Sequence, residues 1–148
     1  MSQSSPPRSF KEMDLSLFDA NHVARYQATG GEEGYIWNTA PILLLTTRGR
    51  KSGEPRIHPL IFVENGGNPA IIASKGGAPT NPAWYENLSA DSNVTVQVKA
   101  DVFQAVARVV DGAERERIWA EGVKLWPQYE DYQRATERQI PVVVLERT

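Results

Sequence analysis

Two glycine-rich stretches carry the cationic side chains that could bind an anionic ligand. The first, residues 47–56, contains four cations and one anion, Glu54. Its cations are Arg48, Arg50, Lys51 and Arg56. Arginine and lysine donate charge-assisted hydrogen bonds to phosphate and carboxylate oxygens, and successive N–H groups of a glycine-rich turn form a concave donor surface. This turn alone supports two interpretations equally: a loop that binds a phosphate or polycarboxylate, and a solvated hairpin tip.

The second stretch, Ser74-Lys75-Gly76-Gly77, stands between a predicted strand and a helix expected to start at Pro82. Helix N-termini attract anions because their first N–H groups lack intrahelical partners. Two such turns beside one sheet edge could bracket a single phosphorylated cofactor. The alternative is a plain chain reversal with a solvated Lys75, and binding is the favoured interpretation.

A third group is aromatic. Trp126, Tyr129 and Tyr132 recur every three residues, which places them on adjacent faces of a helix. Aromatic side chains can wall a flat ring, and a phenol can donate one hydrogen bond. Spacing alone favours an ordinary core or rim role for the three.

Several other chemistries are disfavoured. The chain has no cysteine, which excludes thiol catalysis and cysteine-ligated metals. His22 and His58 lie far apart, so we expect two structural histidines and no metal site. No Ser–His–Asp order or nucleophile-elbow motif is found. If the protein is an enzyme, the reactive atom therefore belongs to a bound cofactor.

Length and net charge limit the number of domains and the classes of partner. A chain of 148 residues predicts one domain, and a net charge of −2 disfavours a nucleic-acid partner. Residues 1–9 are predicted to be a disordered lead, followed by a single domain over residues 10–148. The N-terminus has no secretory signal and no apolar run approaches a membrane span, so a cytoplasmic protein is expected.

The elements predict an α+β fold, a small split β-barrel of about six mostly antiparallel strands with three or four surrounding helices. Strands are expected at residues 36–38, 42–47, 56–64, 70–74, 94–99, 102–110 and 141–146. Helices are expected from Ser9 to Gly30, from Pro82 with an Asn81 cap, over 111–124 with an Asp111–Glu114 capping box, and from Trp126 onwards. A sheet of this size curls into a barrel because closure removes its edges.

The N-terminal helix has a loose apolar stripe from Phe10 to Tyr26. Packing on the domain's own core is favoured. Peripheral contact with the inner face of a membrane and a roof over the ligand site are the alternatives.

With both loops in place, the sequence resembles the deazaflavin-dependent nitroreductases, split-barrel reductases that use reduced coenzyme F-420. The resemblance covers about Pro41 to the C-terminus. It rests on three motifs, residues 44–53 with Arg56, residues 73–77 followed by 81–88, and Trp126-Pro127 with Tyr129 and Tyr132.

The resemblance implies roles for individual residues. The cofactor phosphate and acidic tail would be held by Arg50, Lys51 and Arg56, together with Arg48 and Ser52 of the same loop. The rest of the cofactor would contact Pro59, Ser74, Lys75, Gly76, Pro82, Ala83, Trp84 and Asn87. The substrate side would be lined by Trp126, Tyr129 and Tyr132, and the proton would come from Tyr132, Tyr129, Ser74 or water.

The implied activity is hydride transfer from reduced coenzyme F-420 to a small-molecule acceptor, such as a quinone, a nitroaromatic or another activated double bond. Two alternatives stay open at this point. One is an FMN enzyme on the same barrel, and the other is a non-catalytic carrier of a cofactor or lipophilic ligand. The physiological acceptor and the oligomeric state are open as well.

Overall fold

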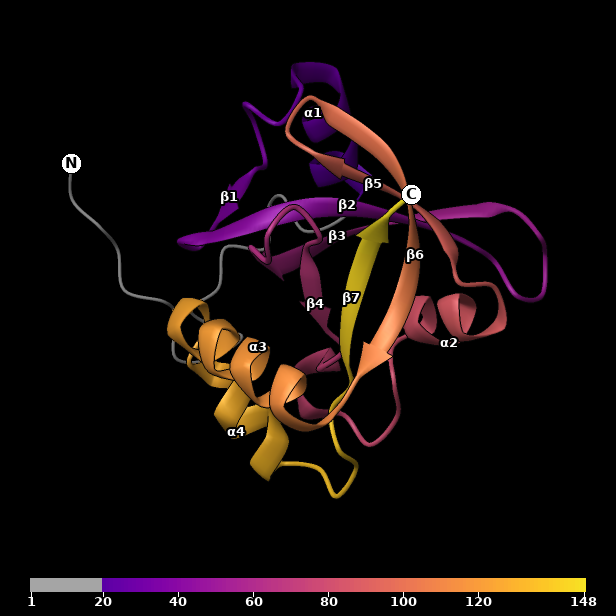
Figure 1. Cartoon of the computed structure of the whole chain (residues 1–148). Coiled ribbons are helices and arrows are strands. Elements are labelled where there is room, and N and C mark those ends of the chain that lie inside the picture. The colour runs from indigo at the N-terminus through magenta and orange to yellow at the C-terminus, as the bar shows by residue number, and fades with distance from the viewer. Residues whose placement is uncertain (1–19) are drawn as a thin grey trace.

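The structure, a computed structural model, describes residues 20–148 and shows a closed antiparallel β-barrel with helices around it (Figure 1). The strands are β1 (Ile36–Trp37), β2 (Ala40–Arg48), β3 (Pro55–Val63), β4 (Ala70–Ile72), β5 (Asn93–Val98), β6 (Asp101–Val110) and β7 (Val142–Arg147). The helices are α1 (Ala20–Thr29), α2 (Ala83–Ala90), α3 (Gly112–Leu125) and α4 (Gln128–Arg134), with a 3-10 turn, η2 (Lys75–Gly77).

Six strands close the barrel in the order β2-β3-β4-β7-β6-β5. The last pairing returns β5 to β2, with Leu45 opposite Val96, and β1 adds to β2 outside the ring. Every pairing is antiparallel. The expected barrel is thus confirmed, and closure gives each of its six strands a partner on both sides.

The apolar run in β2 is continuous because this strand is buried against two cores. One is an inner core inside the barrel, and the other is an outer core between the barrel and the helices. Leu43 and Leu45 point into the barrel, whereas Ile42 and Leu44 point outwards beneath the helices. The outer core also contains Tyr26 of α1 and Ile118 of α3. A strand buried on both faces has no polar alternation, which is why its sequence reads as uniformly apolar.

The helices cover different parts of the barrel. In Figure 1, α3 and α4 lie together at the lower left, α2 stands at the right, and α1 lies at the top. The β2–β3 hairpin, which carries the first basic loop, extends to the right beyond the barrel. No helix in the part of the chain that the structure describes has the length and apolarity to cross a bilayer.

One expected helix cap is wrong, and a second lacks the expected side-chain hydrogen bonds. Pro82, not Asn81, is the N-cap of α2, and the Asn81 side chain accepts a hydrogen bond from Arg138 instead. Asp111 is the N-cap of α3, as expected, but its side chain makes no cap bond, and Glu114, the other member of the expected capping box, accepts two hydrogen bonds from Arg108. The expected start of the first helix at Ser9 lies outside the described residues, while its end at Gly30 is confirmed.

Candidate active site

The first basic loop is a tight turn whose backbone donors are mostly used within it. The N–H of Gly49 donates to the carbonyl of Glu54 at 2.8 Å, and the N–H of Gly53 donates to the carbonyl of Gly49 at 2.8 Å. The N–H of Glu54 donates to the Ser52 hydroxyl at 3.1 Å. The expected concave donor surface is therefore wrong for these groups, and anion binding falls to the exposed side chains. These are Arg48, Arg50, Lys51, Ser52 and Arg56.

Asn87 joins this hairpin tip to α2. Its Oδ1 accepts from the backbone N–H of Arg50 at 3.2 Å and from Arg50 Nη1 at 3.0 Å. Its Nδ2 donates to the Thr47 hydroxyl at 3.1 Å, and the residue is only 3% exposed. A buried amide with both ends bonded fixes the position of the tip relative to the helix.

The second loop has an unusual backbone. The φ values are +48° at Lys75, +63° at Gly76 and +83° at Gly77. Glycine adopts this left-handed region without steric cost, whereas lysine does not. The Lys75 side chain is exposed, and its ammonium donates to the Thr80 hydroxyl at 3.2 Å. Ser74 is half-buried at the start of the turn.

This loop packs directly on α4. A Cβ atom at Gly77 would lie 2.8 Å from the Tyr132 carbonyl oxygen and 3.0 Å from its Cα, so only glycine fits there. The contact joins the lysine-bearing loop to the helix that carries two of the three expected substrate-side aromatics.

The aromatic group divides by burial. Trp126 is 2% and Tyr129 4% exposed in the outer core, and Trp126 stacks on Trp37 with ring centroids 5.5 Å apart. Tyr132 is half-buried, and its hydroxyl accepts from Trp126 Nε1 at 3.3 Å. Burial raises the pKa of Tyr129 and of Tyr132, so both phenols hold their protons at neutral pH.

Sequence reasoning missed Arg138, which follows α4. Its guanidinium donates to the carbonyls of Ala73, Ser74 and Ala78 and to Asn81 Oδ1. No local pattern marks an arginine in a polar segment, and its acceptors lie 57–65 residues earlier in the chain.

The remaining expected site residues occupy different environments. Pro59 is buried on β3, and Pro82 is buried at the start of α2, where Ala83 is exposed. Trp84 is 5% exposed and packs in the inner core. Of the histidines, His22 is buried with Nε2 at 2.6 Å from the Gly34 carbonyl, and burial lowers the pKa of the half-buried His58.

Five cations of the two loops share one property. None of them makes a salt bridge with any described residue; the ion pairs of residues 20–148 all lie elsewhere. They are Arg48, Arg50, Lys51, Arg56 and Lys75. Their charge is therefore not neutralised within the described fold, a condition that suits an anionic ligand.

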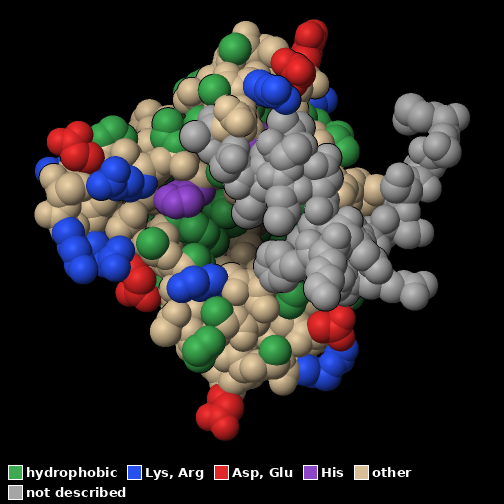
Figure 2. All heavy atoms as spheres, turned by 180° about the vertical axis from the view of Figure 1, so that it is seen from behind, with side chains coloured by type: hydrophobic (Ala, Val, Ile, Leu, Met, Phe, Trp, Pro, Cys, Tyr) green, Lys and Arg blue, Asp and Glu red, His purple; other side chains and the backbone are tan. Residues whose placement is uncertain are grey.

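The surface is hollowed on the face opposite to that of Figure 1. Figure 2 shows hydrophobic side chains within this hollow and a Lys or Arg side chain beside it. The combination suits a ligand that has both an apolar ring and anionic groups.

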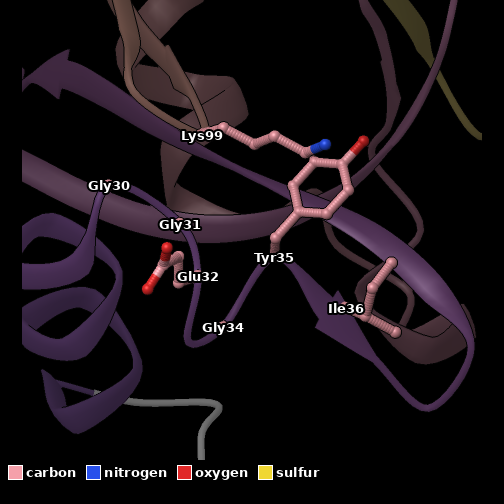
Figure 3. Close-up of a pocket in the computed structure, with 7 residues that line it drawn as sticks. All are labelled: Gly30, Gly31, Glu32, Gly34, Tyr35, Ile36 and Lys99. Carbon is pink, nitrogen blue, oxygen red and sulfur yellow. The ribbon is translucent and has the colours of Figure 1, made fainter.

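A separate pocket of about 350 Å³ lies between the α1–β1 connection and the β5–β6 turn (Figure 3). Lys99 Nζ lies 4.5 Å from the centroid of the Tyr35 ring in this pocket. It shares no residue with the expected site.

Comparison with known proteins gives the family. The sequence model of the F420H(2)-dependent quinone reductase family matches residues 19–147. The Mycobacterium tuberculosis protein named F420H(2)-dependent quinone reductase Rv1261c is 38% identical over 153 aligned positions, which cover 91% of this chain and 99% of that protein.

Solved structures agree with this result. A structure described as an F420-H2 dependent reductase (FDR-A) is 46% identical, with a TM-score of 0.67 over 72% of this chain and 94% of that chain. A second, described as a domain-swapped dimer, is 41% identical, with a TM-score of 0.70 over 84% and 94%.

The chain belongs to the F420H(2)-dependent quinone reductase family. It is an oxidoreductase whose cofactor is reduced coenzyme F-420, which confirms the class of enzyme and the cofactor expected from the loop motifs. The unneutralised cations fit the phosphate and acidic tail of that cofactor.

Proposed function

We propose that this protein transfers a hydride from reduced coenzyme F-420 to a quinone, with the cofactor lying across the two basic loops. The observation that carries the proposal is the set of five unneutralised cations on two loops that adjoin α2 and α4. A quinone is proposed because the relatives are named as quinone reductases.

The side chains that would hold the cofactor are those free to contact it. Lys51 and Arg56 would bind its phosphate and acidic tail, with Arg48 and Ser52 beside them. Lys75, Ser74 and Gly76 would contact the cofactor from the second loop. Because the Asn87 amide is bonded to Arg50 and Thr47, we assign it the task of positioning the hairpin tip. Trp84 lies in the inner core, so it would act by fixing α2.

The bound cofactor supplies the hydride. The protein orients the reactants, excludes water and supplies a proton. Reduction of a quinone to a hydroquinone consumes one hydride and one proton. Tyr132 is the best-placed donor. Its hydroxyl oxygen accepts a hydrogen bond from Trp126 Nε1, so the hydroxyl proton of Tyr132 stays available to another acceptor. Tyr129 is buried, so it would serve as the wall behind Tyr132.

Peripheral membrane contact and a location at the inner face of the membrane remain predictions. They depend on the helix expected from residue 10 onwards, most of which lies outside the described residues.

Fluorescence titration of the purified protein with reduced and oxidised F-420 and with FMN tests the cofactor assignment. We expect micromolar binding of the deazaflavin and weaker binding of FMN. Preferential binding of FMN would contradict the proposal and favour an FMN enzyme on the same barrel. A second assay follows oxidation of reduced F-420 with a quinone and with a nitroaromatic, and binding without turnover would favour a carrier.

A further inference from the structure

Arg138, between α4 and β7, is bonded to the second basic loop by every nitrogen of its side chain. Nε donates to the Ala78 carbonyl at 2.9 Å, and Nη2 donates to the Ser74 carbonyl at 2.7 Å. Nη1 donates to the Ala73 carbonyl at 3.1 Å and to Asn81 Oδ1 at 2.7 Å. All four acceptors belong to residues 73–81. No carboxylate of the described residues pairs with this guanidinium.

The conformation of this loop depends on stabilising contacts from outside it. Lys75 has a φ of +48°, a left-handed conformation that costs free energy in a residue other than glycine and persists only where the surroundings enforce it. Within the turn, the Gly77 N–H donates to the Ser74 carbonyl at 2.9 Å and the Ala78 N–H to the Lys75 carbonyl at 3.1 Å. The guanidinium adds charge-assisted bonds that are stronger than these neutral ones.

Arg138 is itself fastened to α4. Gln133, the neighbour of Tyr132, donates from Nε2 to the Arg138 carbonyl at 2.8 Å. The same side chain accepts from the Ile140 N–H at 3.0 Å through Oε1. Gly77, on the loop, packs on the Tyr132 backbone. The loop and α4 are therefore joined twice, by the guanidinium and by the glycine contact.

We propose that Arg138 is a positioning residue that holds the Ser74–Asn81 loop in its cofactor-binding conformation and sets its place relative to Tyr132. This inference rests on the proposed function of that loop. A planar guanidinium reaches four acceptors from fixed directions, which a lysine ammonium cannot do. The role therefore depends on the shape of the side chain as well as its charge.

The experiment titrates the full chain with reduced F-420 in the variants Arg138→Gln and Arg138→Lys. Arg134→Gln is the matched control, because Arg134 is an exposed arginine of α4 that pairs with Asp131 and makes no hydrogen bond to the loop. Arg138→Gln should raise the Kd at least about tenfold, the usual effect of losing one charge-assisted hydrogen bond, and the control should stay within about twofold. Arg138→Lys should regain only part of the affinity.

Two results would overturn the inference. One is an Arg138→Gln protein that melts earlier but binds the cofactor with wild-type affinity below its melting temperature, since that is a role in stability alone. The other is full affinity in Arg138→Lys, which would leave only a role for charge. If Arg138→Gln does not fold, Arg138→Lys carries the test.

Amide hydrogen exchange over residues 74–80 separates this inference from the proposed function. Exchange should be faster in Arg138→Gln than in Arg134→Gln, with or without cofactor. Equal exchange in the two variants would contradict the stabilisation of the loop by Arg138. A wild-type protein that does not bind F-420 would instead refute the proposed function, while the exchange measurement would still decide the role of Arg138.

Discussion

Arg50 and Lys51 are adjacent cations in the hairpin tip, yet the structure gives them different environments. The backbone N–H and the guanidinium of Arg50 both donate to Asn87, so this arginine fixes the tip against α2. Lys51 is exposed and makes no salt bridge with a described residue. An ammonium on a flexible stem is then available to an incoming anion.

Lys51→Ala should weaken binding of reduced F-420 about tenfold, because it removes one charge-assisted contact and no contact within the fold. Fluorescence titration measures the affinity, and thermal melting checks that the fold is unchanged. Lys124→Ala, which removes a lysine of α3 paired with Glu121, is the control of equal charge. Wild-type affinity in Lys51→Ala would remove this residue from the site.

Tyr132→Phe should lower turnover by about ten- to a hundredfold, less than the roughly hundred- to ten-thousandfold effect of a general acid because water partly replaces the phenol. Cofactor affinity should stay unchanged. Since burial raises the pKa of Tyr132, the wild-type activity should not fall through loss of this proton near neutral pH. Tyr35→Phe, at a half-buried tyrosine of the separate pocket, is the control, and wild-type turnover in Tyr132→Phe would place the proton source elsewhere.

At the scale of elements, the contact between η2 and α4 depends on one missing side chain. Gly77→Ala would place a Cβ 2.8 Å from the Tyr132 carbonyl and strain a φ of +83°. Gly67→Ala has a similar φ of +89° in the β3–β4 turn but meets nothing within 4 Å. Both should lose roughly 1 kcal/mol from the left-handed backbone. Only Gly77→Ala should lose more free energy of unfolding than this, as measured by denaturant unfolding. It should also bind the cofactor more weakly, as measured by titration.

Tyr26 connects three elements through one hydroxyl. It donates to the Ile42 carbonyl at 2.9 Å and accepts from the Lys99 N–H at 2.7 Å, so α1 is fixed to β2 and to the β5–β6 turn. Burial is the main cause that raises the pKa of this phenol from 10.0 to about 12.

This shift predicts a loss of stability in alkali. Below pH 10 both the folded and the unfolded chain keep the Tyr26 proton, and the contribution is fully present. Between pH 10 and about 12 only the unfolded chain releases it, so the free energy of unfolding falls as pH rises, by up to about 3 kcal/mol. Urea unfolding of wild type and Tyr26→Phe across this range checks it. The difference between the two proteins should shrink with pH, and a constant difference would contradict the assignment.

The strands were predictable from sequence because they are apolar runs or, in β5 and β6, alternate between apolar and polar residues. The ends of β2, β5 and β6 fell within two residues of expectation. The N-cap of α2 and the capping-box hydrogen bonds of α3 were not, since Asn81 and Glu114 pair instead with Arg138 and Arg108, on other elements. In the site, the basic loops were visible as local composition. The Asn87 bridge and the Arg138 contacts were not, because they join segments 37 to 65 residues apart.

At the scale of the whole molecule, a net charge of −2 coexists with a local cluster of cations. Cofactor affinity should therefore fall with added salt, because the Debye length shrinks from about 10 Å at 0.1 M to about 3 Å at 1 M. Titrations in KCl check this, and Lys51→Ala should show a shallower dependence than Lys124→Ala. Affinity independent of salt would mean that the loops do not bind the cofactor through charge.

The place of β7 in the barrel has a consequence for how the protein is made. This strand comes last in the chain order of the sheet but lies between β4 and β6, pairing with both. While a ribosome is still adding residues 142–147, the nascent chain holds β4 and β6 with open, unpaired edges, which are sites of aggregation. The ring can therefore close only after the ribosome has added β7, so the barrel forms late in synthesis or after it.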